Sequence, residues 1–127
     1  MMHEEGLSKQ ERLYLKQSID LLFSAGSKGF AAWPLRGIFR LTDRTEGEPA
    51  VEMLISVPKR CFKRAVKRNR VKRQVRDAFR RHKGELTVPE GKKGLLAFIW
   101  LDNKLHDSAT VEDHVQTILQ HFSHHQP

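Results

Sequence analysis

Apolar residues recur along the chain with two different spacings, and these spacings predict a mixture of helices and strands. The first helical pattern covers about residues 16–25, where three apolar side chains share one face and Gly26 follows as a stop signal. Residues 29–34, which contain glycine and proline, predict a turn or an edge segment. The chain is therefore expected to begin with a short helix that leads into the first strands.

Two strands are predicted next, at residues 35–42 and 51–57, and the polar loop 43–49 between them predicts that they form a hairpin. The apolar run 94–101 predicts a buried strand. A closing helix is predicted over 110–122, because its apolar residues recur at core spacing. This order of elements indicates a mixed α and β fold.

A long helix is predicted between the second and third strands, after Pro58 and up to about His82. At 100° per residue its side chains divide into an apolar stripe, which would pack on the sheet, and a cationic stripe on the far side. The apolar stripe consists of Val71, Val75, Ala78 and Phe79, and the cationic stripe contains Asn69, Arg73, Arg76 and Arg80.

Positive charge is concentrated on this helix and on the residues just before it. The chain has a formal net charge of +8, and residues 59–81 alone hold 12 cations against one acid, Asp77. Such segregation focuses a positive potential on one element, and nucleic acid is the partner that best matches it. The alternative, a helix charged only for solubility, would normally interleave acids for pairing.

The remaining composition favours a small protein of a reducing compartment. A length of 127 residues fits one domain, 1–127, and we expect about 1–8 and 123–127 to be flexible. Cys61 is the only cysteine, so a disulfide framework is not expected. The first thirty residues contain no long apolar run, so we expect neither a signal peptide nor a membrane span. These features predict a cytoplasmic protein with no membrane partner.

Two blocks of sequence frame the basic helix. Residues 56–60 read Ser-Val-Pro-Lys-Arg, and residues 65–79 contain the triplet Arg68-Asn69-Arg70 followed by a Lys-Arg-x-x-Arg pattern at 72–76. Weaker matches lie toward the N-terminus, at Arg12, Leu13, Ile19, Phe23 and Gly26. Together these residues resemble the signature of the bacterial ribonuclease P protein family.

The resemblance implies an α+β fold in which a four-stranded sheet and three helices form an α/β sandwich, similar to the second domain of ribosomal protein S5. The strand before the basic helix, the helix itself and the next strand would form a left-handed crossover. Connections of this kind are otherwise almost always right-handed, so sequence patterning alone would not predict this one.

The resemblance also implies two RNA-binding surfaces. The surface that faces the catalytic RNA would consist of Arg68, Asn69, Arg70, Lys72, Arg73 and Arg76. A cleft between the first helix and the sheet would hold the single-stranded 5′ leader of precursor tRNA, with Ile19, Phe23, Phe39, Ser56, Lys59 and Arg60 as its residues. Further phosphate contacts are expected from Lys63, Arg64, Lys67 and Arg80. For Ile19 and Phe23 ordinary core packing is the alternative, because their spacing fits a core equally well.

This sequence departs from the family pattern at three places. The link 61–64 between the strand and the helix is one residue longer than usual, Pro58 stands where serine is typical, and Phe39 stands where tyrosine is typical. Phe39 lacks the tyrosine hydroxyl, and Pro58 lacks a backbone donor.

The resemblance implies that the chain is the protein subunit of an endoribonuclease that removes the 5′ leader of precursor tRNA. The RNA subunit would carry the hydrolysis, so no catalytic protein residue is expected, and one protein would bind each RNA. Magnesium ions would be bound mainly by the RNA and the substrate, because the sequence has no carboxylate cluster for a protein-only site. The alternatives are a non-catalytic RNA-binding module, such as a ribosomal or RNA-chaperone protein, and, more remotely, a protein-only nuclease.

Overall fold

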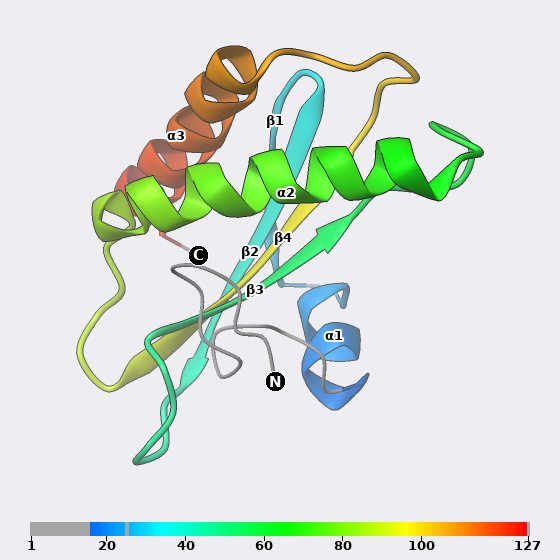
Figure 1. Cartoon of the computed structure of the whole chain (residues 1–127). Coiled ribbons are helices and arrows are strands. Elements are labelled where there is room, and N and C mark those ends of the chain that lie inside the picture. The colour runs from blue at the N-terminus through cyan, green and yellow to red at the C-terminus, as the bar shows by residue number, and fades with distance from the viewer. Residues whose placement is uncertain (1–15, 25, 127) are drawn as a thin grey trace.

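The structure is a computed structural model that describes residues 16–24 and 26–126 (Figure 1). The elements are α1 (Lys16–Leu22), β1 (Lys28–Ala32), β2 (Leu35–Asp43), β3 (Val51–Ser56), α2 (Ala65–His82), the short 3-10 helix η2 (Lys83–Glu85), β4 (Lys92–Trp100) and α3 (Ser108–His124). The four strands form one sheet in the order β1-β2-β4-β3. The predicted flexible segment 1–8 and the family-like residues Arg12 and Leu13 lie outside the described residues.

β4 lies between β2 and β3, so the predicted hairpin of residues 35–42 and 51–57 is wrong. β2 instead pairs antiparallel with β1 through a tight turn at Trp33 and Pro34, and with β4 on its other side. All residues from 93 to 98 in β4 are buried. A strand that is buried on both faces fits the interior of a sheet, and this is why β4 lies between β2 and β3.

β3 and β4 are parallel neighbours joined through α2. Seen from the side of α2, with both strands running up and to the right, β4 lies to the left of β3 (Figure 1). The crossover is therefore left-handed, as the family resemblance implies and against the general rule. The α+β fold with one four-stranded sheet and three helices is confirmed.

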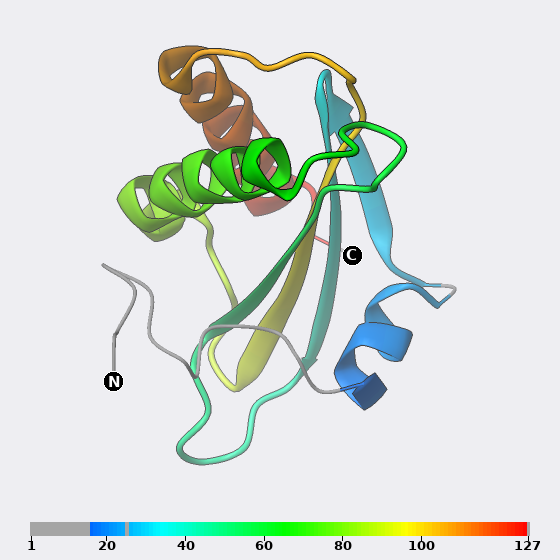
Figure 2. The ribbon, with the colours of Figure 1, turned by 45° about the vertical axis from the view of Figure 1, so that its right-hand side comes forward.

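The helices lie on both faces of the sheet (Figure 2). α2 and α3 cover the face that holds the larger core, where Phe39, Phe79, Phe98, Trp100 and Phe122 are fully buried. α1 covers part of the opposite face, where Leu22, Leu95 and Ala97 form a smaller core with half-buried residues around them. The molecule therefore has three layers, and its two faces differ in how completely they are covered.

α2 follows its predicted pattern, because Val71, Val75, Ala78 and Phe79 are all buried against the sheet. α3 extends two residues beyond the predicted end at 122. The Ser123 hydroxyl accepts from the Thr87 amide at 2.9 Å, and Gln126 Nε2 donates to the Thr87 carbonyl at 2.8 Å. These contacts join the end of α3 to the segment before β4, and the flexibility predicted for residues 123–127 stays a prediction.

Candidate RNA-binding surface

The first part of α2, residues 65–76, carries the six residues predicted to face the catalytic RNA. Asn69, Arg70 and Arg73 are exposed, and Lys72 and Arg76 are half-buried. Among the described residues, none forms a hydrogen bond or an ion pair with Arg70, Lys72 or Arg73. Lys63, Arg64 and Lys67, at and before the start of the helix, are exposed as well. This arrangement leaves several guanidinium and ammonium groups available to an external anion.

Arg68, the first residue of the Arg-Asn-Arg triplet, has a different environment. Its Nη1 donates to the carbonyls of Phe62 and Lys63, at 2.8 Å each. The side chain is half-buried and ties the link before α2 to the first turn of the helix. Arg68 therefore positions this link, and its predicted contact with RNA stays a prediction.

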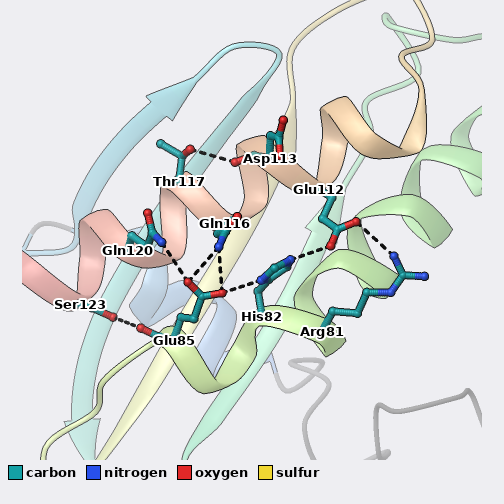
Figure 3. Close-up of polar contacts among 9 residues, drawn as sticks. All are labelled: Arg81, His82, Glu85, Glu112, Asp113, Gln116, Thr117, Gln120 and Ser123. Carbon is teal, nitrogen blue, oxygen red and sulfur yellow. Dashed lines mark hydrogen bonds and ion pairs between the residues drawn. The ribbon is translucent and has the colours of Figure 1, made fainter.

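The second part of α2 carries cations that are paired within the protein (Figure 3). Arg80 lies 3.7 Å from Asp77, and Arg81 Nη1 lies 3.1 Å from Glu112 Oε1. His82 bridges two carboxylates, with Nδ1 at 2.5 Å from Glu85 and Nε2 at 2.7 Å from Glu112. The Arg80–Asp77 pair lies within α2, whereas the contacts of Arg81 and His82 join the end of α2 to η2 and α3.

The ionisation of this cluster follows from its hydrogen bonds. The bonds to Glu112 and Glu85 raise the pKa of His82 above its usual value, although partial burial opposes the shift. Gln116 and then His82 lower the pKa of Glu85, and His82 lowers the pKa of Glu112. The cluster is therefore most stable with a charged imidazolium between two carboxylates. Sequence patterning missed it, because its members come from three separate elements.

A small cleft lies between the end of α1 and the strands β1 and β2. Its volume is about 180 Å³, and its lining is Leu22, Phe23, Ser24, Ser27, Gly29, Arg36 and Ile38. Phe23 is 48% exposed, whereas Ile19 is half-buried in the smaller core. The structure thus places Phe23 at a surface where an aromatic ring is accessible, and it gives Ile19 a packing role.

The other predicted leader contacts lie outside this cleft. Ser56 is half-buried at the end of β3, and Lys59 and Arg60 are exposed in the turn that follows. None of the three lines the cleft beside Phe23. Any single ligand of both places would have to extend beyond this cleft.

The prediction that Phe39 lines the leader cleft is wrong. Phe39 is fully buried on the α2 and α3 face, where its ring stacks on Phe122 with centroids 5.2 Å apart. Alternate residues of a strand face opposite sides, so a shift of one position exchanges the faces. Ile38 and Arg40 are the residues that face α1: Ile38 packs in the smaller core, and Arg40 Nη1 donates to the Ser24 hydroxyl at 3.3 Å.

Two other kinds of site, a metal centre and a membrane span, are not found among the described residues. The described residues contain no group of three or more His, Cys, Asp and Glu side chains arranged to hold a metal ion. No helix within residues 16–24 and 26–126 is both long and apolar enough to cross a membrane.

The sequence is similar to known ribonuclease P proteins. A model of the family Ribonuclease P matches residues 7–123. The chain is 43% identical over 117 residues to a ribonuclease P protein component of Porphyromonas gingivalis, covering 90% of this chain and 84% of the relative. It is 37% identical over 87 residues to that of Chlorobium phaeobacteroides, covering 67% of this chain and 59% of the relative.

The fold is also similar to solved structures of ribonuclease P proteins. The ribonuclease P protein from Thermotoga maritima superimposes with a TM-score of 0.70 at 25% identity, covering 87% of this chain and 96% of the other. The protein from Staphylococcus aureus gives a TM-score of 0.68 at 17% identity, over 87% and 93% of the two chains, a likeness that concerns the fold alone. With the fold and most of the length matched, the chain belongs to the ribonuclease P protein family, whose members are protein components of ribonuclease P.

Proposed function

We propose that this chain binds the catalytic RNA of ribonuclease P through α2 and helps that RNA to remove the 5′ leader of precursor tRNA. The observation that carries the proposal is that three cations on the first part of α2 form no hydrogen bond or ion pair with the described residues. Arg70, Lys72 and Arg73 have no partner among the described residues, and Asn69 lies exposed beside them. Arginine forks match the geometry of phosphate oxygens, and Asn69 adds a hydrogen bond without repelling its neighbours.

In this proposal the hydrolysis belongs to the RNA, and the protein binds and positions the partners. Magnesium is then held by the RNA and the substrate, since the described residues provide no suitable donor cluster. The one acid on α2, Asp77, already lies beside Arg80. We therefore propose that no protein side chain takes part in a metal-dependent step.

Reconstitution tests the proposal directly. The purified chain is mixed with a bacterial ribonuclease P RNA and precursor tRNA at low magnesium concentration, and the release of the 5′ leader is followed. Stimulated release is expected, because added cations replace part of the screening that magnesium provides. Equal cutting with and without the protein would favour a non-catalytic RNA-binding module. Cutting by the protein without any RNA subunit would indicate a protein-only nuclease.

We further propose that the cleft beside α1 contributes to binding of the leader. The support is the exposed ring of Phe23 next to the exposed Arg36, since aromatic rings stack on unpaired bases without demanding a sequence. Phe23→Ala should weaken binding of precursor tRNA by about 1 kcal/mol relative to mature tRNA. Leu21→Ala is the matched control, because Leu21 is also exposed on α1 but does not line the cleft. Equal losses for both tRNAs would refute a leader contact.

A further inference from the structure

The turn between β1 and β2 consists of two residues with opposite environments. Pro34 is buried, and its carbonyl accepts from the Leu101 amide at 2.8 Å, which ties the turn to the end of β4. Trp33, by contrast, is 60% exposed. Its indole forms no hydrogen bond and no ring contact with the described residues. The turn therefore holds a large aromatic side chain at the surface on a fixed backbone.

A single exposed aromatic residue needs no explanation by itself, so the surroundings of Trp33 decide what it can bind. Two further segments lie at the same end of the sheet as the turn (Figures 1 and 2). One is the loop 101–106 after β4, which the bond between Leu101 and Pro34 joins to the turn. The other is the link 57–64 before α2, where the Cys61 thiol lies 3.6 Å from the carbonyl of Trp100, the last residue of β4. The turn, the loop and the link thus meet at the end of β4.

The loop and the link give this end of the sheet a positive charge. They contain five exposed cations, Lys59, Arg60, Lys63, Arg64 and Lys104. None of these five side chains forms a hydrogen bond or an ion pair with the described residues. The one acid of the two segments is Asp102, whose carboxylate accepts from the Asn103 amide at 2.7 Å and lies 2.8 Å from His106 Nε2. The five cations are therefore available to an external polyanion.

An indole close to such cations matches the two parts of a nucleotide. A base stacks on a flat aromatic ring, and the cations attract the phosphates on either side of that base. Stacking of this kind requires an unpaired base, which folded RNA offers in loops, bulges and single strands. A protein partner of the same surface would need a matching group of acids. RNA therefore fits both the indole and the charge.

We propose that Trp33 stacks on an unpaired RNA base whose neighbouring phosphates contact the cations of the loop and the link. The inference rests on the proposed function, since it names a further contact of the same RNA-binding protein. Trp33 was not among the residues predicted from the sequence to bind RNA, and it lies outside both α2 and the cleft beside α1. The base belongs either to the catalytic RNA or to precursor tRNA, two sources with the same chemistry that titration distinguishes.

Intrinsic fluorescence tests the stack in the full chain. The only other tryptophan of the sequence, Trp100, is fully buried, so a change of emission on RNA binding is expected to come from Trp33. The protein is titrated separately with a bacterial ribonuclease P RNA and with precursor tRNA. Quenching by one of the two RNAs is expected, and it identifies the source of the base. Trp33→Phe, in which only Trp100 emits, should show no quenching.

Affinity measurements distinguish stacking from a simple apolar contact. Trp33→Ala should weaken binding of the quenching RNA roughly five- to 100-fold, the range expected for the loss of one base stack. Trp33→Phe keeps a flat ring and should bind within about threefold of the unmodified protein, whereas Trp33→Leu should lose as much affinity as Trp33→Ala. Leu21→Ala is the matched control, because Leu21 is an exposed apolar residue on α1 and should leave the affinity unchanged.

The outcomes separate this inference from the proposed function. If the unmodified protein binds neither RNA, both fail. If RNA binds and the emission stays unchanged, or if Trp33→Ala binds as tightly as the unmodified protein, the stack is overturned while the proposed function stands. Because Trp33 is exposed, its replacement is expected to leave the fold intact, which circular dichroism checks. The emission of the unmodified protein decides the question even if a variant unfolds.

Discussion

The two parts of α2 carry the same residue types but use them differently. In the first part, residues 65–76, Arg70 and Arg73 have no partner within the described residues. In the second part, residues 77–82, Arg80, Arg81 and His82 each contact a carboxylate. One continuous helix thus combines a surface of unpaired cations with a cluster that joins it to α3.

The difference indicates where stability and binding reside. Adjacent cations without counterions repel one another, which lowers the stability of the folded chain. The same repulsion is relieved when a polyanion binds. The first part of α2 is therefore expected to contribute affinity and little stability, and the second part is expected to contribute stability and little affinity.

The largest expected effect is on RNA binding. Replacing both Arg70 and Arg73 by glutamine should weaken binding of the catalytic RNA by about 3 kcal/mol, or roughly 100-fold. The slope of log K against log salt should decrease by about 1.5, because two phosphate contacts are lost. Filter binding at several salt concentrations measures both quantities.

The same double variant tests the other half of the comparison. Because the two side chains form no hydrogen bond or ion pair with the described residues, the free energy of unfolding of the variant should change by less than about 0.5 kcal/mol. An unchanged salt slope would show that these arginines do not contact phosphates. A large loss of stability would show that the first part of α2 also supports the fold.

The next effect concerns stability. His82→Leu removes the link between Glu85 and Glu112, and it should lower the free energy of unfolding by about 2 kcal/mol near pH 6. Urea unfolding measures this loss. His124→Leu is the control, since His124 is exposed at the end of α3 and should matter little. If RNA affinity fell as much as stability, the division of α2 into two parts would be wrong.

A smaller effect is expected from pH in the unmodified chain. The pKa of His82 is raised above 6.5 in the folded state, so its contribution is complete below pH 6.5 and is lost as pH rises through the raised value. The pKa values of Glu85 and Glu112 are lowered from 4.5, so their contribution is lost as pH falls through the lowered values. Between about pH 4.5 and 6.5 the cluster should therefore stabilise the fold most. The decline above this range should be absent in His82→Leu.

The contrast between α2 and the sheet shows what the sequence can predict. The stripes of α2 depend on a local period, and the buried residues Val71, Val75 and Phe79 match it. Strand order depends on contacts between distant segments, so the insertion of β4 between β2 and β3 was not predictable from spacing. A strand also alternates its faces at every residue, and a shift of one position is enough to place Phe39 on the wrong side of the sheet.

In the candidate site, too, the features that depend on a local pattern were predicted, and those that depend on contacts between distant segments were not. The exposed cations of the first part of α2 were predicted, because they depend only on composition and the helical period. The anchoring of Arg68 to the Phe62 and Lys63 carbonyls depends on the path of the preceding link. The His82 cluster depends on how α2 and α3 meet, and no local pattern carries that information.

The smallest expected effect concerns Asp77, which marks the boundary between the two parts. Its ion pair with Arg80 is 3.7 Å long and partly exposed, so Asp77→Asn should change stability by less than about 0.5 kcal/mol. Removing the only acid of α2 should strengthen RNA binding about twofold at low salt, and screening should abolish this gain at high salt. Titrations at two salt concentrations measure it. A loss of affinity instead would mean that Asp77 accepts a hydrogen bond from the RNA, and the binding part of α2 would then extend past residue 76.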